Sequence, residues 1–342
     1  MWPNEYGSIN LARLCPSHHI KNHRYNSLGM STPFHRRDVR FESQRLSCAA
    51  WYYVPADLAP GERRAAIVMA HGWSGVKEMC LANFADAFAA AGFVVLVFDY
   101  RYLGGSDGEP RGQILPDEQR RDYQNAITWV ASQREVDPEL IGLFGTSYSG
   151  GHVLVVAAED RRVKAVVAHV PAVGVRSTTL RWLRRGMFSE VWRAARLIVR
   201  QLLRPGQTLM IPVVSAGGGP ATLPGKEAWQ WKQRTAKLAP AWKNEVTVRS
   251  VIAGLRDSVR PFIPRIAPTP LLMVVASRDH YCFTDEQLRA FATAGEPKKL
   301  LQVEGGHFDF YEEPGLAQVL PAQVEWFTRH LTTAARAAES RA

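Results

Sequence analysis

The sequence predicts an α/β protein in which helices cover both faces of a mostly parallel sheet and a helical cap is inserted. Short apolar runs alternate with segments of helical periodicity, which is typical of parallel strands joined by right-handed crossovers. The alternation stops near Pro171 and resumes at residue 270. The segment between holds five of the ten tryptophans, so we interpret it as an ordered insertion and not a linker.

Two runs rich in aromatic and β-branched residues, 38–43 and 46–55, predict strands before the alternation begins. The later strands have continuous apolar runs, as expected of strands buried on both faces. These runs lie at 65–70, 93–99, 140–144, 163–170, 270–276 and 299–305. Helices are predicted at 76–91, 116–133, from Tyr148 onward, 188–204, 284–293 and 316–336. Gly92 ends the first of them, and Pro205 and Gly206 end the fourth.

The helix at 188–204 is expected to separate an apolar face from an arginine face. Its apolar positions are Phe188, Val191, Trp192, Ala195, Ile198, Val199 and Leu202, and its arginines are Arg193, Arg196, Arg200 and Arg204. The arginine face has three interpretations: a solvated surface, a site that attracts acidic substrates such as carboxylates or phosphates, or a surface for an anionic membrane. We favour the first and do not expect a membrane partner.

These patterns divide the chain into three parts. Residues 1–29 lack sustained periodicity and are predicted to form a disordered tail, and Met30 raises the hypothesis that translation starts there instead of at Met1. A core domain is predicted over 30–174 and 266–342. The cap is predicted over 175–265.

Charge and composition narrow the class of function. The net charge of +10 is confined to 175–265, which has 17 Lys or Arg and 4 Asp or Glu, while the rest of the chain carries −3. Such local basicity argues against a nucleic-acid partner. We find no membrane span or signal peptide, so a cytoplasmic location is expected. The four cysteines are scattered and are expected to be reduced thiols, and no metal or cofactor is expected.

The stretch GTSYS places Ser147 between a predicted strand and a predicted helix. A sharp turn there would expose the serine hydroxyl, and it needs small residues two positions before and after the serine. Gly145 meets this requirement, whereas Ser149 stands where glycine is usual. Ser149 adds only a hydroxymethyl group, so we interpret it as a mild variation and Ser147 as a nucleophile.

A serine nucleophile needs a base and a group that orients the base. His307 follows the last strand in a glycine loop, and Asp279 is the first carboxylate after the strand at 270–276. The order Ser147, Asp279, His307 suits a triad on such a sheet. His71, His152 and His169 are interpreted as structural, and Asp285 and Glu286 as the first turn of a helix. The backbone N–H groups of Trp73 and Tyr148 are predicted to form the oxyanion hole.

Several motifs together resemble those of the α/β-hydrolase superfamily: HGWSG followed by KE, FDYRYLGGSDG, GTSYSGG, ASRD and GGH. The resemblance covers about residues 38–336. It is closer to the dienelactone hydrolase and Xaa-Pro peptidase-like group, which includes polyketide acyl transferases and thiohydrolases, and WKNEVTVRS in the cap is similar to that last subgroup. The longer DYRYLGGSDG departs from the common form at the pocket wall.

These features predict a serine hydrolase that cleaves a small-molecule carboxylic ester or thioester through an acyl-enzyme. Three alternatives stay open. The first is an acyltransferase that passes the acyl group to a small alcohol or amine, since the same residues serve both reactions. The second is a peptidase of the Xaa-Pro type, and the third is a noncatalytic binding protein on the same scaffold.

Overall fold

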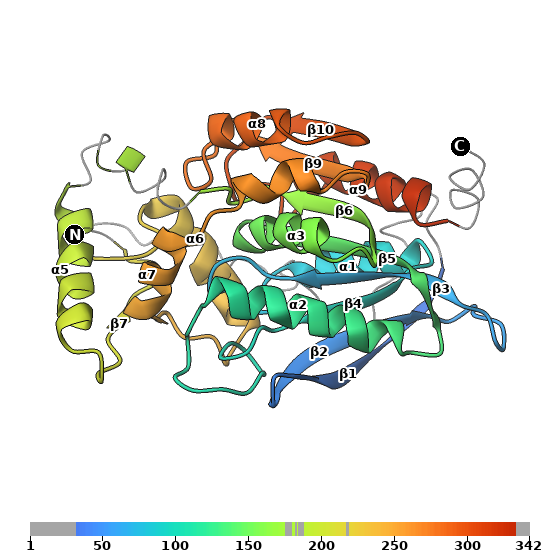
Figure 1. The fold of residues 1–342 in the computed structure, drawn as a ribbon, viewed down its shortest axis with the longest axis horizontal. Coiled ribbons are helices and arrows are strands. Elements are labelled where there is room, and N and C mark those ends of the chain that lie inside the picture. The colour runs from blue at the N-terminus through green and yellow to red at the C-terminus, as the bar shows by residue number, and fades with distance from the viewer. Residues whose placement is uncertain (1–31, 175–179, 182, 184–187, 217–218, 333–342) are drawn as a thin grey trace, which may run out of the picture.

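A mixed sheet forms the centre of the computed structural model, which describes residues 32–174, 180–181, 183, 188–216 and 219–332. Within these ranges the main sheet has eight strands in the spatial order β1-β2-β4-β3-β5-β6-β9-β10 (Figure 1). β1 pairs antiparallel with β2, and β2 with β4, whereas all other pairs are parallel. The strands are β1 (Phe34–Ser43), β2 (Leu46–Pro55), β3 (Arg64–Ala70), β4 (Val94–Phe98), β5 (Val136–Thr146), β6 (Val163–His169), β9 (Leu271–Ala276) and β10 (Lys298–Val303).

Helices cover both faces of this sheet, as predicted. They are α1 (Leu81–Ala90), α2 (Pro116–Ala131), α3 (Tyr148–Glu159), α8 (Thr284–Ala292) and α9 (Leu316–His330). α1 and α9 pack together, with the rings of Phe88 and Phe327 5.3 Å apart. α2 and α3 lie in front of the sheet in Figure 1 and also contact each other. The carboxyl ends of the parallel strands therefore share one edge between two helical layers.

The first helix begins later than its periodicity predicts. Residues 76–80 form turns, and Cys80 takes the left-handed conformation with φ of 66°, so α1 starts only at Leu81. Val76 and Met79 are buried nevertheless. Asp99 explains the turn, because its carboxylate accepts hydrogen bonds from both the backbone N–H and the Nζ of Lys77. The last helix ends at His330, and residues 333–336 of the predicted span lie outside the described residues.

The predicted cap segment contributes short elements at one end of the sheet. They are α5 (Phe188–Leu203), β7 (Met210–Ile211), α6 (Lys226–Thr235), the 3₁₀ helix η4 (Ala236–Leu238), β8 (Val246–Thr247), α7 (Val248–Arg256) and the 3₁₀ helix η5 (Arg260–Arg265). α5, α6 and α7 lie together at the left of Figure 1, and α5 packs on α7. The predicted tail, 1–29, lies outside the described residues. None of the helices in the described ranges has the length and hydropathy needed to cross a bilayer.

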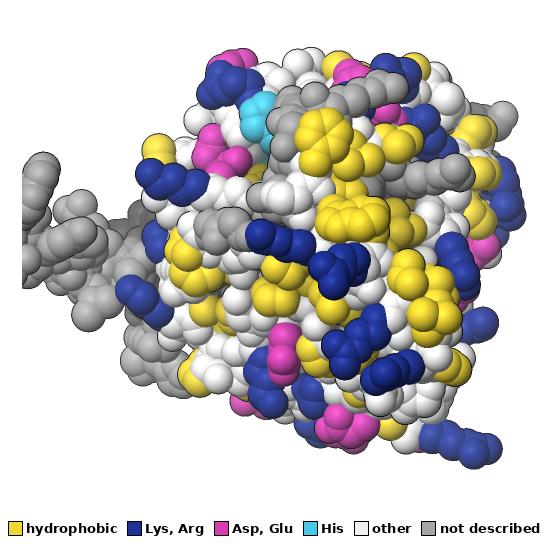
Figure 2. Space-filling view, turned by 90° about the vertical axis from the view of Figure 1, so that its left-hand side faces the viewer, with side chains coloured by type: hydrophobic (Ala, Val, Ile, Leu, Met, Phe, Trp, Pro, Cys, Tyr) yellow, Lys and Arg dark blue, Asp and Glu magenta, His cyan; other side chains and the backbone are white. Residues whose placement is uncertain are grey.

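α5 separates its apolar positions from its arginines, as predicted, but much of the apolar face is exposed to solvent. Four of the apolar positions are exposed: Phe188, Trp192, Val199 and Leu202. Trp192 and Val199 line one surface groove together with Arg196 and Arg200. Figure 2 shows hydrophobic and basic side chains mixed across this end of the molecule. The packed side of α5 carries smaller groups, and Ala194, Leu197 and Ile198 contact the core.

Candidate active site

Ser147 occupies a strained turn between β5 and α3, as its sequence context predicts. Its φ of 55° and ψ of −116° lie outside the regions that L-residues ordinarily adopt. Hydrogen bonds hold the turn: the Ser147 N–H donates to the His169 carbonyl at 2.8 Å, and its carbonyl accepts from the N–H of Ala172 at 2.9 Å. The backbone is thereby fixed in the one geometry that projects the serine side chain from the sheet edge.

Two glycines allow the backbone to pass close to this turn. A Cβ added at Gly145 would lie 2.3 Å from the carbonyl oxygen of Ser149. One added at Gly72 would lie 2.8 Å from the Cβ of Ser147 itself. Both distances are shorter than any tolerable contact. The need for the smallest residue is therefore steric at both positions.

Ser149 is more than a small substitute for glycine. Its hydroxyl is fully buried and lies 2.7 Å from the hydroxyl of Tyr100 and 2.8 Å from that of Tyr123. Tyr123 in turn donates to the Phe144 carbonyl at 2.9 Å. One proton order satisfies all of these groups, running from Tyr100 to Ser149, to Tyr123 and to the carbonyl. Sequence reasoning weighed only the size of Ser149 and missed this chain of hydrogen bonds.

Ser149→Gly, which restores the usual motif, is expected to destabilise the protein. The substitution leaves the buried Tyr100 hydroxyl without its partner, a loss of about 1–3 kcal/mol of unfolding free energy. Urea unfolding monitored by circular dichroism measures the change, with Ser149→Ala as the control for the glycine backbone effect. An unchanged free energy in both variants would show that the hydroxyl contributes nothing.

The structure brings the three predicted side chains together. The Nε2 atom of His307 lies 3.0 Å from the Oγ atom of Ser147, and its Nδ1 atom lies 2.7 Å from Oδ2 of Asp279. His307 and Asp279 are each 2% exposed. The other oxygen of Asp279 accepts from the backbone N–H groups of Tyr281 and Cys282, both at 2.8 Å. The carboxylate is therefore fixed in position before it orients the imidazole.

Pairing dominates the electrostatics of His307 and Asp279. Burial by itself lowers the pKa of His307, but the Asp279 carboxylate, with a further contribution from Cys282, raises that pKa above its ordinary value. Burial likewise opposes the ionisation of Asp279, yet His307 and the two backbone donors hold its pKa below the usual range. The arrangement stabilises an imidazolium, the form a proton-accepting histidine takes during reaction.

Of the other candidate residues, two histidines and two carboxylates have partners elsewhere, whereas Cys282 lies beside Ser147. His152 bonds Gln119 at 2.8 Å, and His169 bonds Gln323 at 3.0 Å, so both are structural. Asp285 and Glu286 occupy the first turn of α8, as predicted. Cys282 lies 4.0 Å from the Ser147 hydroxyl, and burial raises the pKa of its thiol. Its sulfur forms, with Asp279 and His307, a group of potential metal-ligand atoms within 4.8 Å of one another among the described residues.

The two predicted oxyanion donors lie on neighbouring parts of the chain, Trp73 in the loop after β3 and Tyr148 at the start of α3. Within the described ranges, the backbone N–H groups of Trp73 and Tyr148 donate to no acceptor. Tyr148 N–H opens α3, where the helix dipole favours negative charge. The side chains of the two residues pack edge to face, with ring centroids 4.9 Å apart, which fixes the loop after β3 against the start of α3.

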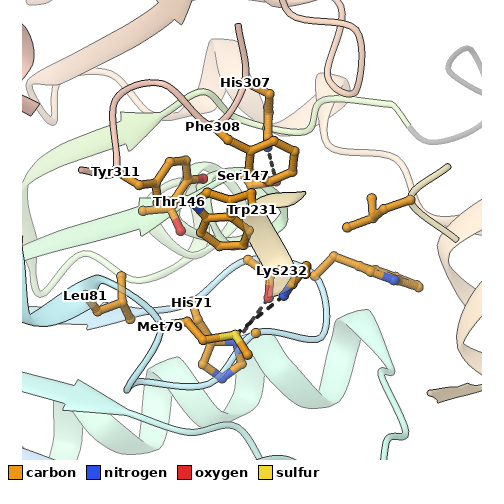
Figure 3. A pocket seen from close by; sticks show the side chains of 14 residues that line it. His71, Met79, Leu81, Thr146, Ser147, Trp231, Lys232, His307, Phe308 and Tyr311 are labelled. Carbon is orange, nitrogen blue, oxygen red and sulfur yellow. Dashed lines mark hydrogen bonds between the residues drawn. The ribbon is translucent and has the colours of Figure 1, made fainter. Parts of the chain in front are cut away.

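A narrow pocket with about 30 Å³ of volume open to water reaches the Ser147 side chain. α6 covers it, as Figure 3 shows, by placing Trp231 beside Phe308 and Lys232 at the far end near Met79 and His71. The rings of Trp231 and Phe308 stack 4.7 Å apart. Sequence reasoning missed Lys232, although Ala228, Trp231, Lys232 and Thr235 fall at the i, i+3, i+4, i+7 spacing of a buried helix face.

The chain is similar in sequence to one protein family and to several named proteins. The family described as X-Pro dipeptidyl-peptidase (S15 family) matches residues 21–309. The quorum-quenching protein AidA of Acinetobacter baumannii is 29% identical over 85% of this chain and 94% of that protein. The thiohydrolase aneE of Aspergillus aculeatus is 30% identical over 76% of this chain and 84% of that protein.

Solved structures agree on the fold. The crystal structure of the α/β hydrolase GrgF from Penicillium sp. sh18 superposes with a TM-score of 0.71 at 27% identity, covering 86% of this chain and 99% of GrgF. The hypothetical protein PA2218 of Pseudomonas aeruginosa gives 0.73 at 27% identity, covering 88% and 95%. These matches confirm the predicted fold and resemblance. The chain belongs to the X-Pro dipeptidyl-peptidase (S15) family and is an enzyme of the α/β-hydrolase class.

Proposed function

We propose that the protein is a serine hydrolase that cleaves a small-molecule ester or thioester through an acyl-enzyme on Ser147. The observation that carries this proposal is the continuous hydrogen-bonded chain from Asp279 through His307 to Ser147, at 2.7 and 3.0 Å. Hydrogen bonds of this length permit direct proton transfer between serine and imidazole. The apolar pocket beside Ser147 suits the acyl part of a substrate.

In the first half of the reaction, the Ser147 oxygen attacks the acyl carbon while Nε2 of His307 takes its proton. The backbone N–H groups of Trp73 and Tyr148 stabilise the oxyanion. His307 then returns the proton to the leaving alcohol or thiol as the bond to the acyl carbon breaks. In the second half, water attacks the acyl carbon while His307 accepts its proton, and His307 returns that proton to the Ser147 oxygen as its bond to the acyl carbon breaks and the acid departs. Asp279 stays ionised and holds the imidazole in place.

The segment 175–265 is proposed to act as a cap over this site, because α6 supplies Trp231 and Lys232 to the pocket. A second candidate function is acyl transfer, in which a small alcohol or amine takes the place of water. The name of one relative supports keeping it, because grgF is a polyketide transferase, whereas the thiohydrolase aneE supports hydrolysis. Product analysis by mass spectrometry, with and without an added alcohol or amine, distinguishes the two reactions.

Ser147→Ala is expected to abolish covalent labelling by a fluorophosphonate probe, because the probe reacts only with an activated serine oxygen. In-gel fluorescence of the purified protein and the variant measures the labelling, and Cys282→Ser serves as the control for the neighbouring thiol. Labelling that persists in Ser147→Ala would discard Ser147 as the nucleophile. Cys282→Ser is expected to remain labelled, because the Cys282 thiol is not the group with which the probe reacts.

A further inference from the structure

Lys232 is a buried cation in the candidate active-site pocket that the proposed mechanism leaves unused. It lies on the buried face of α6 with Ala228, Trp231 and Thr235, and it is only 2% exposed. It lines the same pocket as Ser147 and His307, at the end opposite to them in Figure 3. A buried ammonium costs several kcal/mol in desolvation unless an anion accompanies it.

The described part of the chain supplies no such anion. The Nζ atom of Lys232 lies 3.6 Å from the sulfur of Met79, and it stands 5.2 and 5.3 Å from the ring centroids of Trp231 and Trp242. Lys77 shows what the fold does elsewhere: this lysine is also buried, and its Nζ atom lies 2.8 Å from Asp99 and 2.7 Å from Glu78. The groups near Lys232 in the described residues are aromatic faces, a thioether and the buried cysteine Cys80, and none of them is a carboxylate.

The neighbouring polar group does not provide the missing charge. His71 lines the same end of the pocket, and burial lowers its pKa to about 3, so it is neutral near pH 7. Burial also lowers the pKa of Lys232, to about 7, as expected of an ammonium without a counter-ion. A bound carboxylate would offset the desolvation cost of the Lys232 ammonium, because opposite charges attract strongly in a site of low dielectric constant.

We propose that Lys232 binds a carboxylate at the far end of the substrate's acyl group, so that the enzyme prefers half-esters or half-thioesters of dicarboxylic acids. This inference rests on the proposed function, because the acyl carbon must sit at Ser147. The apolar walls formed by Trp231, Leu223 and Phe308 would contact the methylene chain between the two ends. A neutral acyl group would fill the same walls but leave the ammonium without an anion.

The test compares 4-nitrophenyl half-esters of succinate, glutarate and adipate with the methyl esters of the same compounds. The members of each pair differ in the terminal group, which is a carboxylate in one and its neutral methyl ester in the other. The wild-type protein is expected to prefer the carboxylate form by at least tenfold in kcat/KM at the chain length that reaches Lys232, with most of the difference in KM. In Lys232→Met that ratio is expected to fall to about one. Lys237→Met removes an exposed lysine from the adjacent η4 and is expected to keep the wild-type ratio.

Two further readouts separate binding from a structural role. Calorimetric titration of the preferred half-ester into Ser147→Ala is expected to give a Kd at least tenfold lower than into the Ser147→Ala, Lys232→Met double variant. Thermal unfolding of Lys232→Met is expected at the wild-type temperature or about 2–4 °C higher, since an uncompensated buried charge is removed. A fall of several degrees in the unfolding temperature would mean that groups of the free protein already stabilise the Lys232 ammonium. This result would overturn the proposal.

The outcomes distinguish this inference from the proposed function. If the wild-type protein releases 4-nitrophenol from the methyl-ester compounds and from the half-esters with equal kcat/KM, the role of Lys232 alone is overturned. The same holds for a preference that survives unchanged in Lys232→Met. If neither series is cleaved and Ser147 is not labelled by the fluorophosphonate probe, both proposals fall.

Discussion

Replacing His307 by alanine is expected to lower kcat on a neutral ester by about 10⁴- to 10⁶-fold, because the serine loses the imidazole that accepts its proton. KM should change far less, since His307 contacts the reacting atoms more than the remote acyl chain. Steady-state kinetics with an active-site titration measure both constants. His35→Ala, on the exposed surface of β1, is the control and should retain wild-type rates.

The pH dependence of the wild-type protein gives this prediction a second readout. A protonated imidazole cannot accept the serine proton, so kcat/KM should rise as pH increases through the pKa of His307. Because Asp279 raises that pKa, the acid limb should lie above pH 6.5, the ordinary histidine value. The residual activity of His307→Ala should lack this limb. A limb that persists in the variant would assign the titration to another group.

Gly145→Ala is expected to destabilise the fold by about 3 kcal/mol, the upper end of the range for over-packing, and to abolish activity. The added methyl group would meet the Ser149 carbonyl oxygen at 2.3 Å and its carbon at 2.6 Å. Backbone cannot rotate away as a flexible side chain would. The start of α3 must therefore shift, and Ser147 shifts with it.

Urea unfolding and ester hydrolysis together test this expectation. Gly206→Ala is the matched control, because a Cβ at Gly206 meets no atom within 4 Å. It should change neither stability nor rate appreciably. A Gly145→Ala protein with wild-type activity would contradict the idea that steric fit at this position holds the nucleophile in place.

The sheet could be predicted because a strand buried on both faces needs a continuous apolar run. The start of α1 could not, since Val76 and Met79 keep helical spacing although they are buried in turns. Periodicity reports which residues are buried, and not the backbone conformation that buries them. On α5, the surface against which the helix packs determines which side chains are buried. Ala194 and Ile198 pack against the core, whereas Trp192 is exposed to solvent.

The positions of Ser147, Asp279 and His307 could be predicted because each follows a parallel strand, and the carboxyl ends of such strands meet at one edge. Lys232 could not be recognised in the same way. Its helical spacing marked it as buried, but a lysine in a basic segment is ordinarily solvated. Only the three-dimensional arrangement reveals that no carboxylate of the described chain accompanies it.

The hydrogen-bonded Ser149 has an evolutionary consequence. Tyr100 lies just beyond β4, in a different crossover from the nucleophile, yet its hydroxyl contacts that of Ser149, so the two positions are expected to influence each other. Ser149→Gly combined with Tyr100→Phe should cost less stability than the two changes summed, which is epistasis between positions 49 residues apart in the chain. If position 149 changed between serine and glycine during evolution, the protein would be less stable until position 100 had changed as well. Tyr100 and Ser149 are therefore expected to change together. A search with the five-residue motif alone includes Ser149 but not Tyr100.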